Sequence, residues 1–337
     1  MEFGFSKEHA LLKQMYREFA ENEVKPLAAE VDEMERFPVE TVEKMVKAGF
    51  MGIPFPKKYG GEGGDNLGYA MAVEELSRVC GTTGVIVSAH TSLGAHPIFE
   101  FGTEEQKEKF LVPLAKGEKL GAFGLTEPNA GTDAAGQQTT AVLDGDEYVL
   151  NGSKIFITNA GYAHTYIIMA MTDKKAGTRG ISAFIVDADT PGFSVGPKEK
   201  KLGIRGSATC ELIFENCRIP KENILGKEGI GFKVAMKTLD GGRIGIAAQA
   251  LGIAQGALDE TIHYVKERKQ FGRSIANFQN TQFQLADMAA KIESARLLVY
   301  KAAYNKDKGL SYSYEAAMAK LVAAETAMEV TTKAVQL

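Results

Sequence analysis

The chain has 337 residues, 45% apolar and 24% charged, which is enough for two or three packed units with a sizeable core. Its net charge of −4 excludes the basic footprint expected of a partner of nucleic acid or of an anionic membrane. No apolar run approaches the ~20 residues of a membrane-spanning helix, and residues 1–8 lack the regions of a secretory signal. Three cysteines without metal-ligand spacing indicate reduced thiols in a cytoplasmic protein, and no metal site is expected.

The first third of the chain has helical apolar spacing. The first helix is expected to bury one stripe, made of Leu11, Leu12, Met15, Phe19 and Val24. Pro38 and Asp65 are typical of helix starts, and residues 83–101 predict a helix buried on all sides. Thr103 followed by Gln106 is a capping-box pattern. We therefore expect an all-α domain over residues 1–118.

From Leu120 the pattern changes to short β-rich runs. Residues 139–143 and 148–150 flank Asp144-Gly145 and predict a hairpin. Asn151-Gly152 predicts a second tight turn, which leads into a strand at 155–157. Further strands are expected at residues 166–171, 181–186 and 211–214. Turn signals at regular intervals favour a β-barrel or sandwich domain over residues 119–228.

Helical periodicity returns at Gly231. Three long helices are expected, at 231–267, 279–305 and 313–337, and their short connections favour an antiparallel bundle over residues 229–337. A bundle normally has a fourth helix, so we expect this one to lack its last helices. The fold class predicted for the whole chain is α+β and multi-domain, with helical domains on either side of a β domain.

Two strand ends, at residues 123–133 and 156–158, carry the groups best suited to a ligand. Glycines in the first segment would let a planar ligand approach the main chain. Phe156 could stack on such a ligand, and hydroxyls that both donate and accept suit the edge of a heterocycle; these belong to Thr126, Thr132 and Thr158. Residues 127–132 are also typical of an irregular turn with no ligand, and this alternative stays open.

Four ordered motifs resemble the acyl-CoA dehydrogenase family, most of all its short-chain, butyryl-CoA type. They are Leu125-Thr-Glu-Pro128 with Gly131-Thr-Asp133, Asn151-Gly-Ser-Lys-Ile-Phe-Ile-Thr-Asn159, Glu267-Arg-Lys-Gln-Phe-Gly272, and Gln279. The resemblance implies FAD-dependent α,β-desaturation of a short-chain acyl-CoA, butyryl-CoA to crotonyl-CoA in type. It also implies electron transfer to an electron-transferring flavoprotein, and a homo-oligomer that is a tetramer.

The resemblance assigns the FAD contacts residue by residue. Those expected within one subunit are Phe123, Leu125, Thr126, Gly131, Thr132, Phe156, Ile157 and Thr158. Those expected to reach the FAD of a neighbouring subunit are Arg268, Phe271, Gln279 and Gln336. Phe156 stands where the family usually has tryptophan. Without the resemblance, Arg268 would be read as an exposed arginine at a helix end.

The acyl-CoA contacts implied by the resemblance are Thr132, Asp240, Gly241, Gly242 and Arg243. Two adjacent glycines inside a helix cost roughly 1 kcal/mol each relative to alanine, so they indicate either close approach of another group or a kink. In most of the family the catalytic base lies beyond the position of Leu337, and in a minority it lies at the position of Gly242. Glycine cannot accept a proton, so the base is expected beyond Leu337, and the chain as given is expected to be inactive.

Two alternatives remain open at this stage. One is an oxidase-like flavoenzyme of the same fold that lets oxygen reach the flavin. The other is a flavin- or CoA-binding fragment without turnover.

Overall fold

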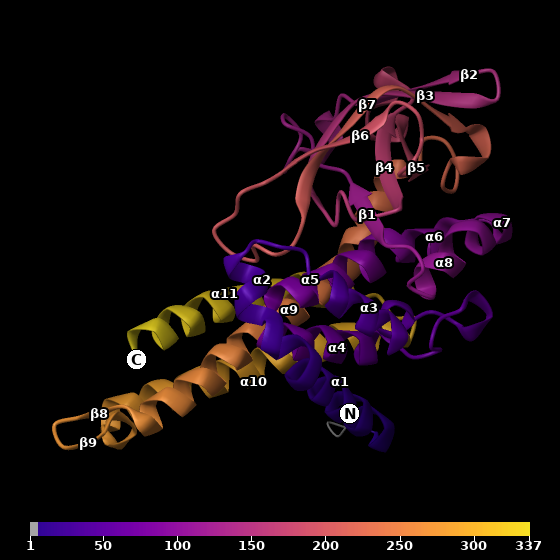
Figure 1. Cartoon of the computed structure of the whole chain (residues 1–337). Coiled ribbons are helices and arrows are strands. Elements are labelled where there is room, and N and C mark those ends of the chain that lie inside the picture. The colour runs from indigo at the N-terminus through magenta and orange to yellow at the C-terminus, as the bar shows by residue number, and fades with distance from the viewer. Residues whose placement is uncertain (1–5) are drawn as a thin grey trace. The chain divides into compact units, whose positions relative to one another are not determined.

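The computed structural model describes residues 6–337, so part of the segment tested for a secretory signal lies outside the described residues. Helices come first in chain order, strands follow and long helices end the chain (Figure 1). The first set of helices is α1 (Lys7–Phe19), α2 (Lys25–Glu33), α3 (Val39–Lys47), α4 (Asn66–Val79), α5 (Gly81–Ser88), α6 (His96–Phe101), α7 (Glu104–Gln106) and α8 (Val112–Ala115). The main strands are β1 (Gly121–Gly124), β2 (Thr140–Asp144), β3 (Glu147–Thr158), β4 (Thr165–Met171), β5 (Ile181–Asp187), β6 (Phe193–Lys198) and β7 (Thr209–Pro220). The last set is α9 (Gly231–Glu267), the short strands β8 (Lys269–Gln270) and β9 (Arg273–Ser274), α10 (Gln279–Asp307) and α11 (Ser313–Gln336).

The chain forms two compact units that do not follow the chain order. Unit 1 contains the residues up to 30, then 65–85 and 243–337, and unit 2 contains 31–64 and 86–242. Helices that are far apart in the sequence therefore share unit 1: α1 and α4 from the first third of the chain, and α10 and α11 from its end. No helix among residues 6–337 is long and apolar enough to cross a membrane. The division into domains at 118 and 228 stays a prediction.

Unit 2 is built on a seven-stranded sheet of order β1-β4-β2-β3-β7-β6, with β5 paired to β4. β4 is buried along its whole length because apolar residues cover both of its faces. Alternate residues Tyr166 and Ile168 belong to one core cluster, whereas Ile167 and Met169 belong to a second one with helical residues. The second cluster joins the sheet to α6, α8 and the first turns of α9, and it thus lies beneath the strand ends where a ligand was expected.

Two local predictions, one in β3 and one in α1, were wrong. Asn151-Gly152 is not a turn, because β3 runs straight through it and pairs with β7 on both sides. Gly152 instead takes φ 139° beside a shift of register between Leu150 and Gly152, so it marks an irregularity in a long strand. In α1, Leu11 and Met15 are exposed, and Tyr16 is the side chain that the helix buries.

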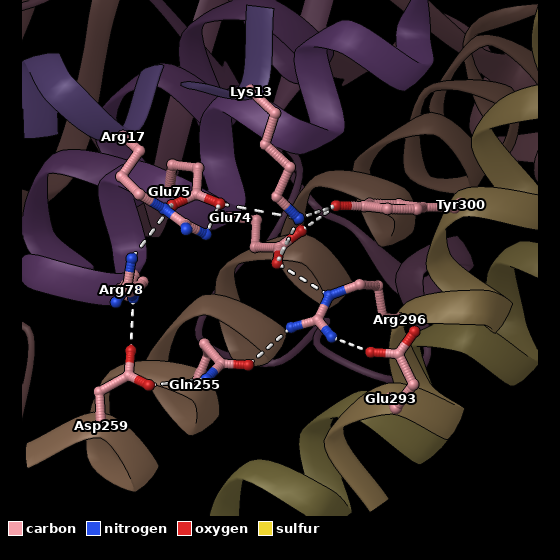
Figure 2. A network of polar contacts seen from close by, with 10 residues as sticks. All are labelled: Lys13, Arg17, Glu74, Glu75, Arg78, Gln255, Asp259, Glu293, Arg296 and Tyr300. Atoms are coloured by element: carbon pink, nitrogen blue, oxygen red, sulfur yellow. Dashed lines mark hydrogen bonds and ion pairs between the residues drawn. The ribbon is translucent and has the colours of Figure 1, made fainter. Parts of the chain in front are cut away.

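The helices of unit 1 are joined by a buried polar network (Figure 2). Its centre is Glu74 of α4, which accepts hydrogen bonds from Lys13 at 3.2 Å, from Arg296 at 3.0 Å and from the hydroxyl of Tyr300. Arg296 also donates to Gln255 of α9 at 2.8 Å. The network links α1, α4, α9 and α10 and satisfies a carboxylate that is 1% exposed.

Candidate functional site

A hollow of about 170 Å³ opens in unit 2, where the ends of β1 and β3 meet helical residues. Six of the twelve residues expected to contact FAD line it: Phe123, Leu125, Thr126, Phe156, Ile157 and Thr158. The remaining lining residues are Ala89, Leu93 and Leu239. Sequence reasoning missed these three, because small and aliphatic side chains in helices carry no signal that separates a cofactor wall from ordinary core.

Main-chain bonding brings the two strand ends together. β1 and β3 are not neighbours in the sheet, but the loop after β1 bonds to β3, since the N–H of Ile155 donates to the carbonyl of Thr126 at 2.9 Å. Glycine at 124, the last residue of β1, also allows a close approach, because a side chain there would begin 2.7 Å from the Cδ1 of Ile168. The loop can therefore lie flat on the sheet.

Phe156 faces solvent because of a bulge in β3. The pairing of β3 with β7 shifts register between Lys154 and Ile157, and Phe156 within that shift takes φ 60°, which is uncommon for a non-glycine residue. A bulge redirects side chains, and Phe156 is 62% exposed whereas Ile157 is 3% exposed. Backbone strain of this kind is typical of ligand sites.

The hollow fits the planar heterocycle of a flavin. Among residues 6–337, the hydroxyls of Thr126 and Thr158 have no hydrogen-bond partner, so both are available to a ligand. Phe156 supplies an exposed aromatic face, and the other lining residues are apolar. None of the nine lining residues is charged, so the hollow itself provides neither an acid nor a base.

Two predicted residues of the first segment do not line the hollow. Gly131 and Thr132 are exposed in the loop that follows Glu127-Pro-Asn-Ala130, and no atom lies within 4 Å of the side-chain position of Gly131. Their assignment to FAD or acyl-CoA stays a prediction.

The expected acyl-CoA residues of α9 are consecutive on a continuous helix. Gly241 and Gly242 are buried, and a side chain at Gly242 would begin 2.8 Å from the Cδ2 of Leu93, which lines the hollow. Glycine at 242 therefore leaves room for the flexible end of the Leu93 side chain. Arg243 lines a separate, open groove of about 470 Å³ in unit 1, with α11 residues Ala317, Lys320, Leu321, Ala324, Glu325 and Met328.

The four residues expected to serve a neighbouring subunit, Arg268, Phe271, Gln279 and Gln336, all belong to unit 1 and are all exposed. Phe271 is 92% exposed with φ 52°, and its ring meets that of Phe278 edge to face at 6.1 Å. No group of three or more His, Cys, Asp or Glu residues among 6–337 could hold a metal ion.

Family models match the chain in three stretches: the acyl-CoA dehydrogenase N-terminal domain over 6–118, the middle domain over 122–217 and the C-terminal domain over 229–337. The chain therefore belongs to the acyl-CoA dehydrogenase family, FAD-dependent oxidoreductases that act on CH–CH groups. The predicted fold class, with helical domains on either side of a β domain, is confirmed.

The individual relatives that resemble the chain include short-chain members of the family. The chain is 67% identical to the short-chain specific acyl-CoA dehydrogenase of Clostridium acetobutylicum over 337 residues, which are 100% of this chain and 89% of the relative. It superposes on butyryl-CoA dehydrogenase from Megasphaera elsdenii with a TM-score of 0.98 at 52% identity, covering 100% and 89% of the two chains. It also matches a chain in a structure of the electron transferring flavoprotein of Acidaminococcus fermentans, with a TM-score of 0.99 at 59% identity and coverages of 100% and 88%. The expectation that the chain is inactive gains no support from these matches.

Proposed function

We propose that the protein is a short-chain acyl-CoA dehydrogenase that desaturates a butyryl-CoA-type thioester and passes electrons to an electron-transferring flavoprotein. The observation that carries the proposal is the hollow between β1 and β3, whose free threonine hydroxyls and exposed aromatic ring suit a flavin. The similarity to a short-chain dehydrogenase, a butyryl-CoA dehydrogenase and a flavoprotein structure supports the substrate and the partner.

Desaturation removes a proton from one carbon and a hydride from its neighbour, and no side chain accepts hydride. FAD, when bound, supplies that acceptor. Thr126 and Thr158 would donate to the polar edge of the ring system, Phe156 would cover it, and Ala89, Leu93 and Leu239 would exclude water. Thr132 and Asp240 to Arg243 would hold the acyl-CoA, and the base is not assigned to a residue of this chain.

We also propose a homo-oligomer, a tetramer as in the family, in which Arg268, Phe271, Gln279 and Gln336 complete the FAD site of a neighbour. Unit 1 has the surface for it, because α10 and α11, which lie side by side (Figure 1), carry apolar residues that are at least 50% exposed. Within each helix these residues are separated by seven or fourteen positions. These are Phe283, Leu297 and Tyr304 on α10, and Tyr314, Leu321, Met328 and Val335 on α11. We further propose a cytoplasmic location, which Cys80, Cys210 and Cys217 support as free thiols.

The test measures FAD content and the anaerobic bleaching of the flavin absorbance by butyryl-CoA. Thr158→Val removes a donor but keeps the shape, so we expect a shifted flavin spectrum and bleaching about tenfold slower, the value of roughly one hydrogen bond. Thr178→Val, on an exposed turn of unit 2, is the control and should bleach as the wild type does.

Three outcomes would contradict the proposal. If the folded protein takes up no FAD, the central statement of the proposal is wrong. Binding of FAD without bleaching by any short-chain acyl-CoA would favour a fragment without turnover. Rapid reoxidation of the bleached protein by air, and none by a protein acceptor, would favour an oxidase.

A further inference from the structure

A buried lysine lies directly behind the hollow, and the function proposed above does not use it. Lys154 of β3 is 0% exposed, and its Cγ lies 3.3 Å from where a side chain on Gly124 would begin. Burying an ammonium group is unfavourable unless partners replace all of its contacts with water. The identity of those partners therefore matters.

The Nζ atom of Lys154 has three acceptors. They are the carbonyl oxygen of Leu125 at 3.1 Å, Oε1 of Glu127 at 2.7 Å and Oε1 of Gln137 at 3.0 Å. An ammonium group has three N–H donors, whereas a neutral amine has two, so the arrangement fits the charged form. Burial lowers the pKa of Lys154 to about 8, and the carboxylate of Glu127 opposes that shift, so the group is mainly protonated at neutral pH.

The counter-charge is itself held in place. Glu127 is 5% exposed and accepts hydrogen bonds from the N–H groups of Thr139, at 3.1 Å, and Gln138. The side chain of Gln137 donates to the carbonyl of Ala134 at 2.9 Å. The segment 134–139 thus braces both acceptor side chains, and the ammonium group has one fixed position.

One of the three acceptors belongs to the wall of the hollow. In a trans peptide the C=O and N–H point in opposite directions, so holding the Leu125 carbonyl at Lys154 turns the N–H of Thr126 to the other side. The carbonyl of Thr126 is fixed in turn by the N–H of Ile155 at 2.9 Å. Thr126 lines the hollow, and its N–H has no partner among residues 6–337.

We propose that Lys154 is a positioning residue: through the carbonyl of Leu125, its buried charge orients and polarises the Thr126 N–H at the FAD edge and raises the electron affinity of the bound cofactor. This inference rests on the FAD site proposed above. Negative charge that two-electron reduction places at that edge is stabilised by a preorganised donor and a nearby buried cation. The donor and the cation stabilise the oxidised state of FAD less than the reduced state.

The test is an anaerobic redox titration of the holoenzyme against a reference dye. Lys154→Met keeps the length of the side chain and removes its charge and donors. At a fixed potential, the ratio of reduced to oxidised FAD is expected to fall about tenfold, which is about 30 mV for a two-electron couple. Lys201→Met is the matched control, because Lys201 also donates to a backbone carbonyl in unit 2, that of Ser207 at 2.6 Å, yet does not line the hollow. Its ratio should equal that of the wild type.

A variant of Glu127, the charged partner of Lys154, distinguishes the proposed effect on the cofactor from a purely structural role of Lys154. Glu127→Gln keeps an acceptor for Lys154 but removes the negative charge, so its ratio should equal or exceed the wild-type value. An equal fall in Lys154→Met and Glu127→Gln would overturn the proposal, as would an unchanged ratio in Lys154→Met. If Lys154→Met does not fold because Glu127 is left unpaired, the double variant Lys154→Met/Glu127→Gln replaces it, and an unchanged ratio there also overturns the proposal. Failure of the wild type to bind FAD would instead remove the proposed function itself.

Discussion

His90 is a single residue whose charge state couples to stability. It is fully buried, its Nδ1 accepts from the N–H of Gly121 at 3.0 Å, and its Nε2 lies 3.1 Å from the carbonyl of Leu114. Because a backbone N–H must donate to Nδ1, the ring proton is on Nε2 and the ring is neutral. Burial lowers the pKa of His90 to about 4. Protonation would break the bond to Gly121, at the first residue of β1.

We predict that His90 makes the protein acid-sensitive. The unfolded chain binds this proton near pH 6.5 and the folded chain only near 4, so the stability associated with neutral His90 is complete above pH 6.5 and lost as pH falls towards 4. The loss reaches about 3 kcal/mol at 1.36 kcal/mol per unit. Urea unfolding between pH 4 and 7 measures it. His90→Gln should flatten this part of the profile, whereas replacing the exposed His263 should not; equal profiles for the wild type and His90→Gln would refute the assignment.

At the scale of elements, Glu74 of α4 bonds residues of α1 and α10, and Arg296 extends the network to α9. Its carboxylate bonds Lys13, Arg296 and Tyr300 (Figure 2). Burial and the neighbouring Glu74 raise the pKa of Tyr300 well above its usual value, so its hydroxyl remains a donor. Removing one partner of a buried ion pair leaves the others charged and unpaired.

We predict that Glu74→Gln lowers the free energy of unfolding by about 3 kcal/mol. Glu293→Gln is the matched control: Glu293 also pairs with Arg296, but its side chain is 59% exposed. Exposed pairs contribute at most about 1 kcal/mol, so this variant should remain close to the wild type. Chemical denaturation measures the free energy of unfolding of both variants. Equal losses would mean that burial does not determine how much these ion pairs contribute to stability.

At the scale of the whole molecule, the oligomer proposed above would use Arg268 and the apolar faces of α10 and α11. We predict that Arg268→Ala raises the FAD dissociation constant about tenfold with little change in thermal unfolding, because a planar guanidinium binds a pyrophosphate at two oxygens. Arg179→Ala, also exposed but in unit 2, should bind FAD as the wild type does. A monomer in sedimentation that retains its FAD would be incompatible with a site completed by a neighbour.

Sequence reasoning found the long helices and the residues with chemical character. The predicted helix at 231–267 has the bounds of α9, and those at 279–305 and 313–337 agree with α10 and α11 within two residues. The capping box at Thr103 and Gln106 forms as predicted. Helix periodicity, caps and turns are local properties, so a short stretch of sequence contains them. Phe156, Thr126 and Thr158 were predicted as ligand contacts from their aromatic ring and hydroxyls. All three line the hollow, and their contact with FAD stays a prediction.

The tertiary structure decided what depends on partners distant in the chain. Asn151-Gly152 has the local chemistry of a turn, but pairing with β7 on both sides extends β3 through it. Lys154 follows in the same strand, and only the loop 125–139 folding over it makes a lysine fully buried. Glycine at 252 and 256 lets α9 approach α4, because side chains there would begin 2.2 Å from the carbonyl oxygen of Glu74 and 2.0 Å from that of Arg78. By itself, the sequence determined the elements and the reactive groups. Long-range packing decided which of these elements and groups meet, because close approach and burial depend on residues that are distant in the sequence.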